Sequence, residues 1–247
     1  MITFTIQLNN NQQFKKFING LDLKASGIDG ELLYIWIKNW KLYLVNFPRN
    51  HIYVSALYLG KVPNEDDNTW QITDNYEDLK RFAKDIKEDD IIHLDKLENS
   101  FEFNNIGKDT YSTGWDSTNE INLLNLDYIC SKAKHFRLKK QDFKVLDLYK
   151  SKCTRLTIEN DKITFDFYED KKNKVIAKHI LCDQYDNEEE DYVHFCNKYF
   201  QQILKKFNSK DVIDVYFDND NPLRVDYKDF VGVVAPRILF DGDIEDI

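Results

Sequence analysis

The segment Tyr192–Ile238 is YVHFCNKYFQQILKKFNSKDVIDVYFDNDNPLRVDYKDFVGVVAPRI, and it contains the clearest pattern in this 247-residue chain. Its first part, YVHFCNKYFQQILKKF, predicts a basic amphipathic helix that carries Lys198 and Lys205 seven residues apart. The runs VIDVYF and LRVDYK follow on either side of the polar turn DNDNP, and VGVVAPRI closes the segment. Two strands joined by such a turn form an antiparallel hairpin, so this segment combines helix and sheet.

Similar helical patterns recur along the chain. They begin near Asn10, Tyr76, Leu126 and Tyr192, so the first and third, and the second and fourth, lie about 116 residues apart. The second of them has a clear start, with Asp74 as the expected N-cap and Glu77 three residues later. The spacing predicts two similar halves with two helices each.

The chain between the expected helices has the pattern of antiparallel strands. Alternating or β-branched runs are separated by short polar turns, and there is little sign of parallel βαβ units. These runs are LLYIWI, KLYLVNF, HIYVSALYL, IIHLDKL, LTIEND, ITFDFYED and KVIAKHIL.

The order of these features resembles the sliding clamps of the proliferating cell nuclear antigen (PCNA) family. The resemblance rests on the Pro222–Leu223 pair that enters a strand ending in Tyr-Lys, on the closing Ala-Pro-Arg-Ile, and on the preceding helix with its two lysines. It implies an α+β DNA clamp fold of two similar domains, with antiparallel sheets outside and four basic helices lining a ring. The expected parts are an N-terminal domain 1–106, a connecting loop 107–122 and a C-terminal domain 123–247.

Charge supports this interpretation only on the helices. The formal net charge of −9 taken alone argues against a nucleic-acid binder. The expected helices are locally basic, and lysines facing a duplex would contact phosphates in any sequence. On the third helix the alignment leaves Lys132, His135 and Arg137 as alternatives. The candidate DNA-binding residues are Lys15, Lys16, Lys80, Arg81, Lys84, Lys132, Arg137, Lys139, Lys198, Lys205, Lys206 and Lys210.

The resemblance also implies a docking surface for partner peptides and edge strands for ring closure. Trp115 is either an exposed anchor or packs on its own half, and Val233 stands where the family usually has an aromatic residue. The candidate peptide-binding residues are Trp36, Trp40, Trp115, Pro222, Val233, Val234, Ala235, Pro236 and Arg237. The expected edge strands are 100–105 and 174–181, and the candidate subunit-interface residues are Phe101, Phe103, Val175, Ile176, Ala177 and Ile180.

A catalytic or metal-binding function is the alternative from another class. Acidic groups at Asp218, Asp220 and Asp226 and at 188–191 could hold a metal, although turns and helix starts account for them. The four cysteines form no CxxC pair and have no histidine at metal spacing, which favours free thiols. We therefore expect no enzyme, no metal and no cofactor.

The sequence thus predicts a DNA polymerase sliding clamp, a processivity factor that tethers replication and repair proteins. The implied partners are double-stranded DNA, a polymerase and other clamp-binding peptides, and an ATP-dependent loader; the implied assembly is a homotrimer, with a heterotrimer left open. No stretch approaches the length of a membrane span, so we expect an intracellular protein at replicating DNA, in a prokaryotic or virus-infected cytoplasm or in a nucleus. The alternatives are a checkpoint clamp subunit, a viral transcription or replication accessory factor, and a scaffold that does not encircle DNA.

Overall fold

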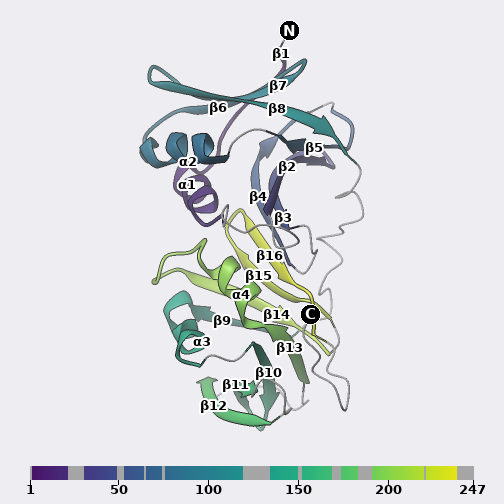
Figure 1. The fold of residues 1–247 in the computed structure, drawn as a ribbon, viewed down its shortest axis with the longest axis vertical. Helices are drawn as coiled ribbons and strands as arrows, with labels where there is room; N and C mark the ends of the chain where they lie inside the picture. Colours follow the sequence, from purple (N-terminus) through teal and green to yellow (C-terminus); the bar gives the residue numbers. More distant parts are fainter. Residues whose placement is uncertain are drawn as a thin grey trace. The chain divides into compact units, whose positions relative to one another are not determined.

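The computed structural model of the chain divides into two compact units (Figure 1). The first contains Met1–Asn125 with Lys228–Val231, and the second contains Leu126–Tyr227 with Gly232–Ile247. The structure describes residues 2–21, 31–48, 53–63, 65–73, 76–118, 134–149, 152–168, 174–182, 191–219 and 221–237.

The first unit is built on antiparallel strands in the order β1-β6-β7-β8-β5-β2-β3-β4. Apolar residues alternate along several of these strands, as in β7, because one face is buried. The strands are β1 (Ile2–Gln7), β2 (Glu31–Lys38), β3 (Lys41–Pro48), β4 (Tyr53–Lys61), β5 (Asn68–Ile72), β6 (Ile92–Leu97), β7 (Ser100–Asn105) and β8 (Asp109–Ser117).

Two helices, α1 (Asn11–Asn19) and α2 (Tyr76–Asp85), pack on strands β7 and β8 of this unit (Figure 1). Phe14 of α1 stacks on Phe103 with ring centres 5.4 Å apart, and Phe82 of α2 lies 6.4 Å from Tyr111. Each helix buries one apolar stripe and leaves a polar face outside, as amphipathic spacing predicts.

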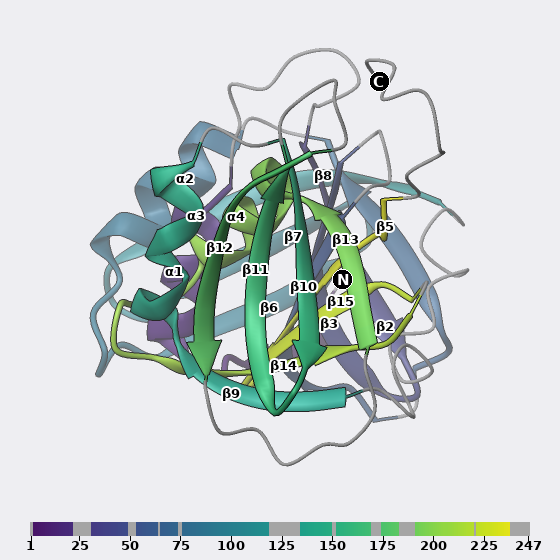
Figure 2. The same ribbon diagram turned by 90° about the horizontal axis from the view of Figure 1, so that it is seen from below.

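The second unit contains a four-stranded sheet in the order β12-β11-β10-β13 and a further antiparallel group in which β14 lies between β15 and β9 (Figure 2). Its strands are β9 (Lys134–Lys139), β10 (Cys153–Glu159), β11 (Lys162–Tyr168), β12 (Val175–Cys182), β13 (Asp191–Cys196), β14 (Val212–Phe217) and β15 (Leu223–Tyr227). Strand β16 (Phe230–Val234) begins in the residues assigned to the first unit and ends in the second.

The helices of the second unit are η3 (Lys140–Lys144), which continues into α3 (Val145–Leu148), and α4 (Asn197–Leu204). Phe143 joins them to the sheet, because its ring lies 5.6 Å from Phe200 of α4 and 6.0 Å from Phe165 of β11. Each unit therefore combines two helical segments with a sheet.

The structure corrects the predicted starts of the third and fourth helices. The predicted start at Leu126 lies outside the described residues, and the described helical segment begins only at Lys140. Before it, Lys134–Lys139 is strand β9 with Phe136 buried. The fourth helix begins at Asn197, because residues 191–196 alternate and bury Val193 and Phe195 as strand β13. The proposed N-cap Asp74 also lies outside the described residues.

A second correction concerns the stretch 107–122, which was expected to be a connecting loop. Residues Asp109–Ser117 form strand β8, and it pairs with β7 along most of its length. Tyr111 and Thr113 are buried while Thr110 and Ser112 are exposed, which is the alternation of a strand with one covered face.

Candidate nucleic-acid interface

Helices α1 and α2 lie side by side, and a lysine from each hydrogen-bonds the C-terminal end of the other. Lys15 Nζ donates to the carbonyl oxygens of Lys84 at 2.6 Å and Ile86 at 2.9 Å. In return, Lys80 Nζ donates to the carbonyl of Leu21 at 2.7 Å, just beyond the end of α1. The last carbonyls of a helix lack partners within it and carry partial negative charge, so an ammonium there is stabilising. These reciprocal contacts indicate that the two helices are antiparallel.

Asn11 secures the turn that follows α2. Its Nδ2 atom donates to the carbonyls of Asp90 at 2.5 Å and Glu88 at 3.3 Å, and the side chain is buried. The Asp90 carboxylate accepts hydrogen bonds from Lys108, from the Lys87 amide at 2.9 Å and from Asn105 Nδ2 at 2.8 Å. The Lys108 ammonium contributes most, and together the three donors lower the pKa of Asp90 from 3.8 to about 2.

On the outer faces of α1 and α2, several of the lysine and arginine side chains that the sequence suggested for DNA contact are half-buried, paired or next to acidic residues in the chain. Arg81 is exposed but forms an ion pair with Asp78 one turn earlier. Lys84 is exposed and Lys16 is half-buried, while the acidic residues Glu77 and Asp85 of α2 are also exposed. This face therefore has mixed charge, and both Lys84 and Arg81 are exposed on it.

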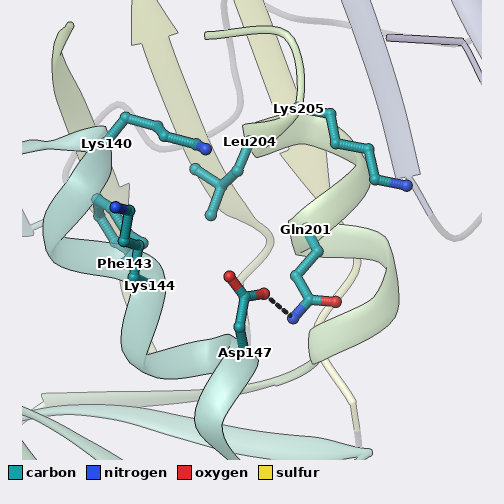
Figure 3. A pocket seen from close by; sticks show the side chains of 7 residues that line it. All are labelled: Lys140, Phe143, Lys144, Asp147, Gln201, Leu204 and Lys205. Atoms are coloured by element: carbon teal, nitrogen blue, oxygen red, sulfur yellow. Dashed lines mark hydrogen bonds between the residues drawn. The ribbon is translucent and has the colours of Figure 1, made fainter. Parts of the chain in front are cut away.

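In the second unit, a cleft lies between η3–α3 and α4 (Figure 3). It has a volume of about 220 Å³, and Lys140, Lys144 and Lys205 line it, above the apolar side chains of Phe143 and Leu204. The Lys140 side chain extends toward Leu204 across the cleft (Figure 3). The Lys205 side chain points away from Lys140 and Lys144, and the Asp147 carboxylate also lines the cleft (Figure 3). The ammonium groups of Lys140 and Lys144 are suited to attract anionic groups such as phosphates.

The lower end of this cleft is closed by a hydrogen bond between the two helical segments. Gln201 Nε2 donates to Asp147 Oδ1 at 3.0 Å and to the Leu146 carbonyl at 3.2 Å (Figure 3). Lys205 Nζ also donates to Gln202 Oε1 at 3.0 Å. The contacts of Gln201 fix the spacing between η3–α3 and α4, which carry the three lysines.

The remaining candidate DNA-binding residues of the second unit fall in different environments. Lys198 is exposed on α4, with its Nζ 5.5 Å from the centre of the Tyr199 ring, and Lys210 is exposed beyond that helix. Lys206 is fully buried, which argues against a contact with DNA. Its neighbour Lys205 is the one that faces the solvent.

The residues assigned to the basic third helix mostly lie on a strand. Arg137 and His135 are on β9, and both bind Asp214 of β14, through Arg137 Nε at 2.8 Å and His135 Nε2 at 2.8 Å. The pKa of Asp214 is lowered, although burial opposes this, because both partners hydrogen-bond the carboxylate. Lys139 ends the same strand, and Lys132 lies outside the described residues.

Sequence reasoning missed Lys144 because it placed the third helix too early. In the segment KQDFKVLDL, the buried residues Phe143, Val145 and Leu146 mark the covered side, and Lys140 and Lys144 stand four residues apart. In an α-helix this spacing would place both lysines on one face, although the structure has a 3-10 helix over these residues. The sequence therefore contained the spacing that indicates this helical segment. We placed the helix too early because the preceding run KHFRLKK is more basic.

The predicted peptide-binding tryptophans of the first unit differ in exposure. Trp36 is buried in β2, which makes it a core residue, whereas Trp40 is 61% exposed in the turn after β2. Trp115 is half-buried in β8, where its ring lies 6.0 Å from Trp70 and 6.4 Å from Phe101. Of the two alternatives for Trp115, the structure thus favours packing on its own half.

The predicted peptide-binding residues of the second unit are close together in the chain. Val233 and Val234 are buried in β16, while Pro222, Ala235 and Pro236 are partly exposed. The backbone of Arg237 is hydrogen-bonded to β13, since its amide donates to the His194 carbonyl at 2.8 Å.

The two predicted edge strands have different outcomes. Strand β7 is hydrogen-bonded to β6 on one side and to β8 on the other, and its Phe101 and Phe103 are fully buried. It is therefore an internal strand, and its assignment to a subunit interface is wrong. Strand β12 lies at the end of its sheet and pairs with β11 (Figure 2). Ala177 is partly exposed there, and the exposed apolar residues of this strand are Val175, Ile176 and Ile180.

The two acidic groups considered for a metal site approach each other at Asp191 and Asp218, where burial and then the nearby Asp218 raise the pKa of Asp191. No group of three or more metal-binding side chains occurs in the part of the chain that the structure describes. Asp226 instead pairs with Arg224 at 2.7 Å, and Asp218 accepts from the Asn219 amide. Asp220 and residues 188–190 lie outside the described residues. Among the described helices, none is long and apolar enough to cross a membrane.

The two units, each with antiparallel strands and a pair of helical segments, define the DNA clamp fold. The PCNA of Thermococcus kodakaraensis matches 95% of this chain and 100% of its own with a TM-score of 0.69 and 14% identity. The PCNA of Entamoeba histolytica matches 96% of this chain and 100% of its own, with a TM-score of 0.67 and 13% identity. The DNA polymerase III subunit beta of Pseudomonas aeruginosa matches 100% of this chain and 66% of its own, with a TM-score of 0.66 and 10% identity.

The predicted PCNA-like clamp fold is therefore confirmed. No model of a protein family matches the sequence, and no curated protein matches it either.

Proposed function

We propose that this protein is a DNA sliding clamp, a non-enzymatic processivity factor that encircles duplex DNA inside the cell and tethers replication and repair proteins to it. The observation that carries the proposal is the lysine-lined helix pair in each unit of a chain that matches sliding clamps over nearly its whole length. Because the sequence identity to these clamps is low, the role of this chain rests on its own residues.

The proposed contacts with DNA are weak and independent of sequence. The cleft lysines Lys140, Lys144 and Lys205, together with Lys84 and Lys198, would attract backbone phosphates, which every register of a duplex offers equally. A ring is retained by its topology, so these contacts need only centre the duplex. Strong contacts would oppose sliding.

Ring closure would use the outer edge of β12, which among the described strands pairs only with β11, and an edge of β8 from a neighbouring copy. The β12 edge carries Ile176 and Ile180, each 50% exposed. Within the described strands, β5 pairs with β8 at residues 115–117, and the Thr73 amide donates to the Gly114 carbonyl, so this ladder covers only the later part of that edge of β8. Edge strands pair readily across subunits, and repeating one such head-to-tail contact gives a closed ring. We propose a homotrimer, opened and closed on DNA by an ATP-dependent loader.

Polymerases and other partners would dock through short peptides. The partly exposed Pro222, Ala235 and Pro236 remain candidates in the second unit, and the exposed Trp40 remains one in the first. The buried Val233, Val234 and Trp36 would support these surfaces from within the core. Trp115 would act in the same supporting way.

A second candidate function is a specialised clamp relative or a scaffold that does not encircle DNA. It is favoured by the first unit, where Lys15 and Lys80 are engaged with helix ends and Arg81 is paired with Asp78. The acidic net charge of −9 points the same way.

Topological retention on DNA distinguishes these functions without knowledge of the natural loader. The protein is threaded onto linear duplexes fixed to beads at one end, and the free end is then blocked with a bulky protein. A clamp stays on the blocked duplex through a high-salt wash and leaves when a restriction enzyme cuts the duplex. If retention is absent, or is the same with and without the end block, the encircling function is wrong and the scaffold is favoured.

A further inference from the structure

Two cysteines that are distant in the sequence stand directly opposite each other in the second unit. Cys153 is the first residue of β10 and Cys196 is the last of β13, and they are partners in the antiparallel register. Opposite residues of an antiparallel pair point to the same face of the sheet, so the two thiols share one face. Neither cysteine is part of a disulfide in this structure.

The hydrogen-bond pattern identifies which kind of pair they form. The Asn197 amide donates to the Lys152 carbonyl at 3.1 Å, which makes the adjacent pair 152/197 a hydrogen-bonded one. Because the two kinds of pair alternate, Cys153 and Cys196 form a non-hydrogen-bonded pair, in which Cα atoms are about 4.5 Å apart. A disulfide spans Cα separations of about 4.4 to 6.8 Å, so this pair lies at the short end of the permitted range.

We propose that Cys153 and Cys196 form a reversible disulfide, which makes this end of the sheet a redox modification site. Cys196 is partly exposed and Cys153 is 2% exposed, so Cys196 reacts first with an oxidant from solution. The oxidant class is a small disulfide, RSSR. The Cys196 sulfur attacks it, forms a mixed disulfide and releases one RSH that carries the Cys196 proton.

The second step closes the bond. The Cys153 sulfur attacks the Cys196 sulfur, the mixed disulfide breaks, and the second RSH leaves with the Cys153 proton. Two protein thiols are thereby oxidised to one disulfide, while RSSR is reduced to two RSH. A cross-strand bond at a non-hydrogen-bonded pair must draw its β-carbons from about 5 Å to about 4 Å, and such strained bonds are readily reduced.

The position gives the bond a structural consequence. Cys196 is the N-cap residue of α4, the helix that contributes Lys205 to the cleft. A covalent link to β10 fixes the start of this helix and closes the long chain segment between the two cysteines, which restricts the unfolded state. Oxidation is therefore expected to raise resistance to unfolding and to slow amide exchange at the start of α4.

The test uses the full chain with Cys130 and Cys182 replaced by serine, so that only the proposed pair remains. Cys182 is opposite Ile163, and Cys130 lies outside the described residues. After incubation with glutathione disulfide at low protein concentration, we expect both thiols to be lost together. Peptide mapping without reductant should show 153 linked to 196 within one chain. The urea midpoint should rise on oxidation and return with dithiothreitol.

Single variants Cys153→Ser and Cys196→Ser in the same background provide the control, with circular dichroism to verify folding. We expect the reaction of the Cys153→Ser variant with glutathione disulfide to stop at a glutathione adduct on Cys196. The Cys196→Ser variant should react slowly or not at all. The proposal is overturned if the parent also stops at the adduct, if both thiols stay free, or if the linked peptides come from two chains. Because the readout is covalent, it is independent of DNA binding and can fail or succeed separately from the clamp function.

Discussion

Neutralising the cleft of the second unit tests whether its lysines contact phosphates. The change is the triple substitution of Lys140, Lys144 and Lys205 by alanine. Each phosphate that a protein neutralises contributes about 0.9 to the slope of log affinity against log salt. If each lysine neutralises one phosphate, the slope becomes shallower by about 2.7 per subunit. For one subunit in contact with the duplex, the variant should therefore lose roughly 40-fold less of its affinity than the parent between about 50 and about 200 mM salt, and the difference grows with each further subunit in contact.

The assay is fluorescence anisotropy of a short labelled duplex across that salt range, repeated with a second duplex of unrelated sequence. A matched control replaces three exposed lysines on strands, Lys41, Lys61 and Lys162, and changes the net charge equally. Only the cleft variant should flatten the salt dependence, and both duplexes should give the same result. Equal slopes for the two triple variants would show that the cleft does not face DNA and that only net charge matters.

Three further predictions concern assembly, packing and pH. Ile176→Asp combined with Ile180→Asp should convert a trimer into monomers in a native-mass spectrum, because both side chains are half-exposed on the edge strand β12; an unchanged trimer would move the interface elsewhere. Asn11→Ala should lower the free energy of unfolding in urea by about 1–3 kcal/mol, since it leaves the carbonyls after α2 without their buried donor. The exposed neighbour Gln12→Ala should change it little. The pKa of Asp90 is lowered from 3.8 to about 2. Its contribution to stability is therefore fully present above pH 3.8 and is lost as the pH falls through about 2. Asp90→Asn should make stability fall less steeply over that interval than in the parent, and parallel curves would contradict the ordering role of this carboxylate.

The sequence predicted the architecture well wherever a segment had one covered face. The helices α1 and α2 begin where their apolar stripes begin, at Asn11 and Tyr76. The closing hairpin of β14 and β15 was visible from the alternating runs on either side of its polar turn. In such segments the spacing of the apolar residues alone identifies a helix or a strand, because burial of one side imposes that spacing.

The errors fall where short strands and helices follow one another directly. Strand β13 passes into α4 at Asn197, so aromatic residues such as Tyr192 and Phe195 satisfied a helical pattern while belonging to a strand. Strand β7 was taken for an edge because alternation is the same in internal and edge strands. Only the pairing partners distinguish the two, and one partner of β7 is β8, which lies in the stretch that was expected to be a connecting loop.

Contacts between distant residues also decide what each charged side chain does. Lys15 and Lys80 look like surface lysines in the sequence, yet each satisfies carbonyls on the opposite helix. Nothing local distinguishes them from Lys84, which is exposed. Likewise Lys205 and Lys206 are adjacent, and the helix turns one outward and buries the other.

The two helix pairs therefore use their lysines differently, and this bears on how a duplex would be held. In the first unit, ammonium groups near helix C-termini are partly offset by carbonyl dipoles and by neighbouring acids such as Asp78, so the field that reaches solvent is reduced. In the second unit, Lys140 and Lys144 line an open cleft together with Lys205. Attraction to phosphates should be concentrated on the second unit, and the first should act mainly as a rigid wall. A ring of such chains would attract a duplex mainly through one surface per chain, and because phosphate contacts are the same in every register, the duplex could still slide through the ring.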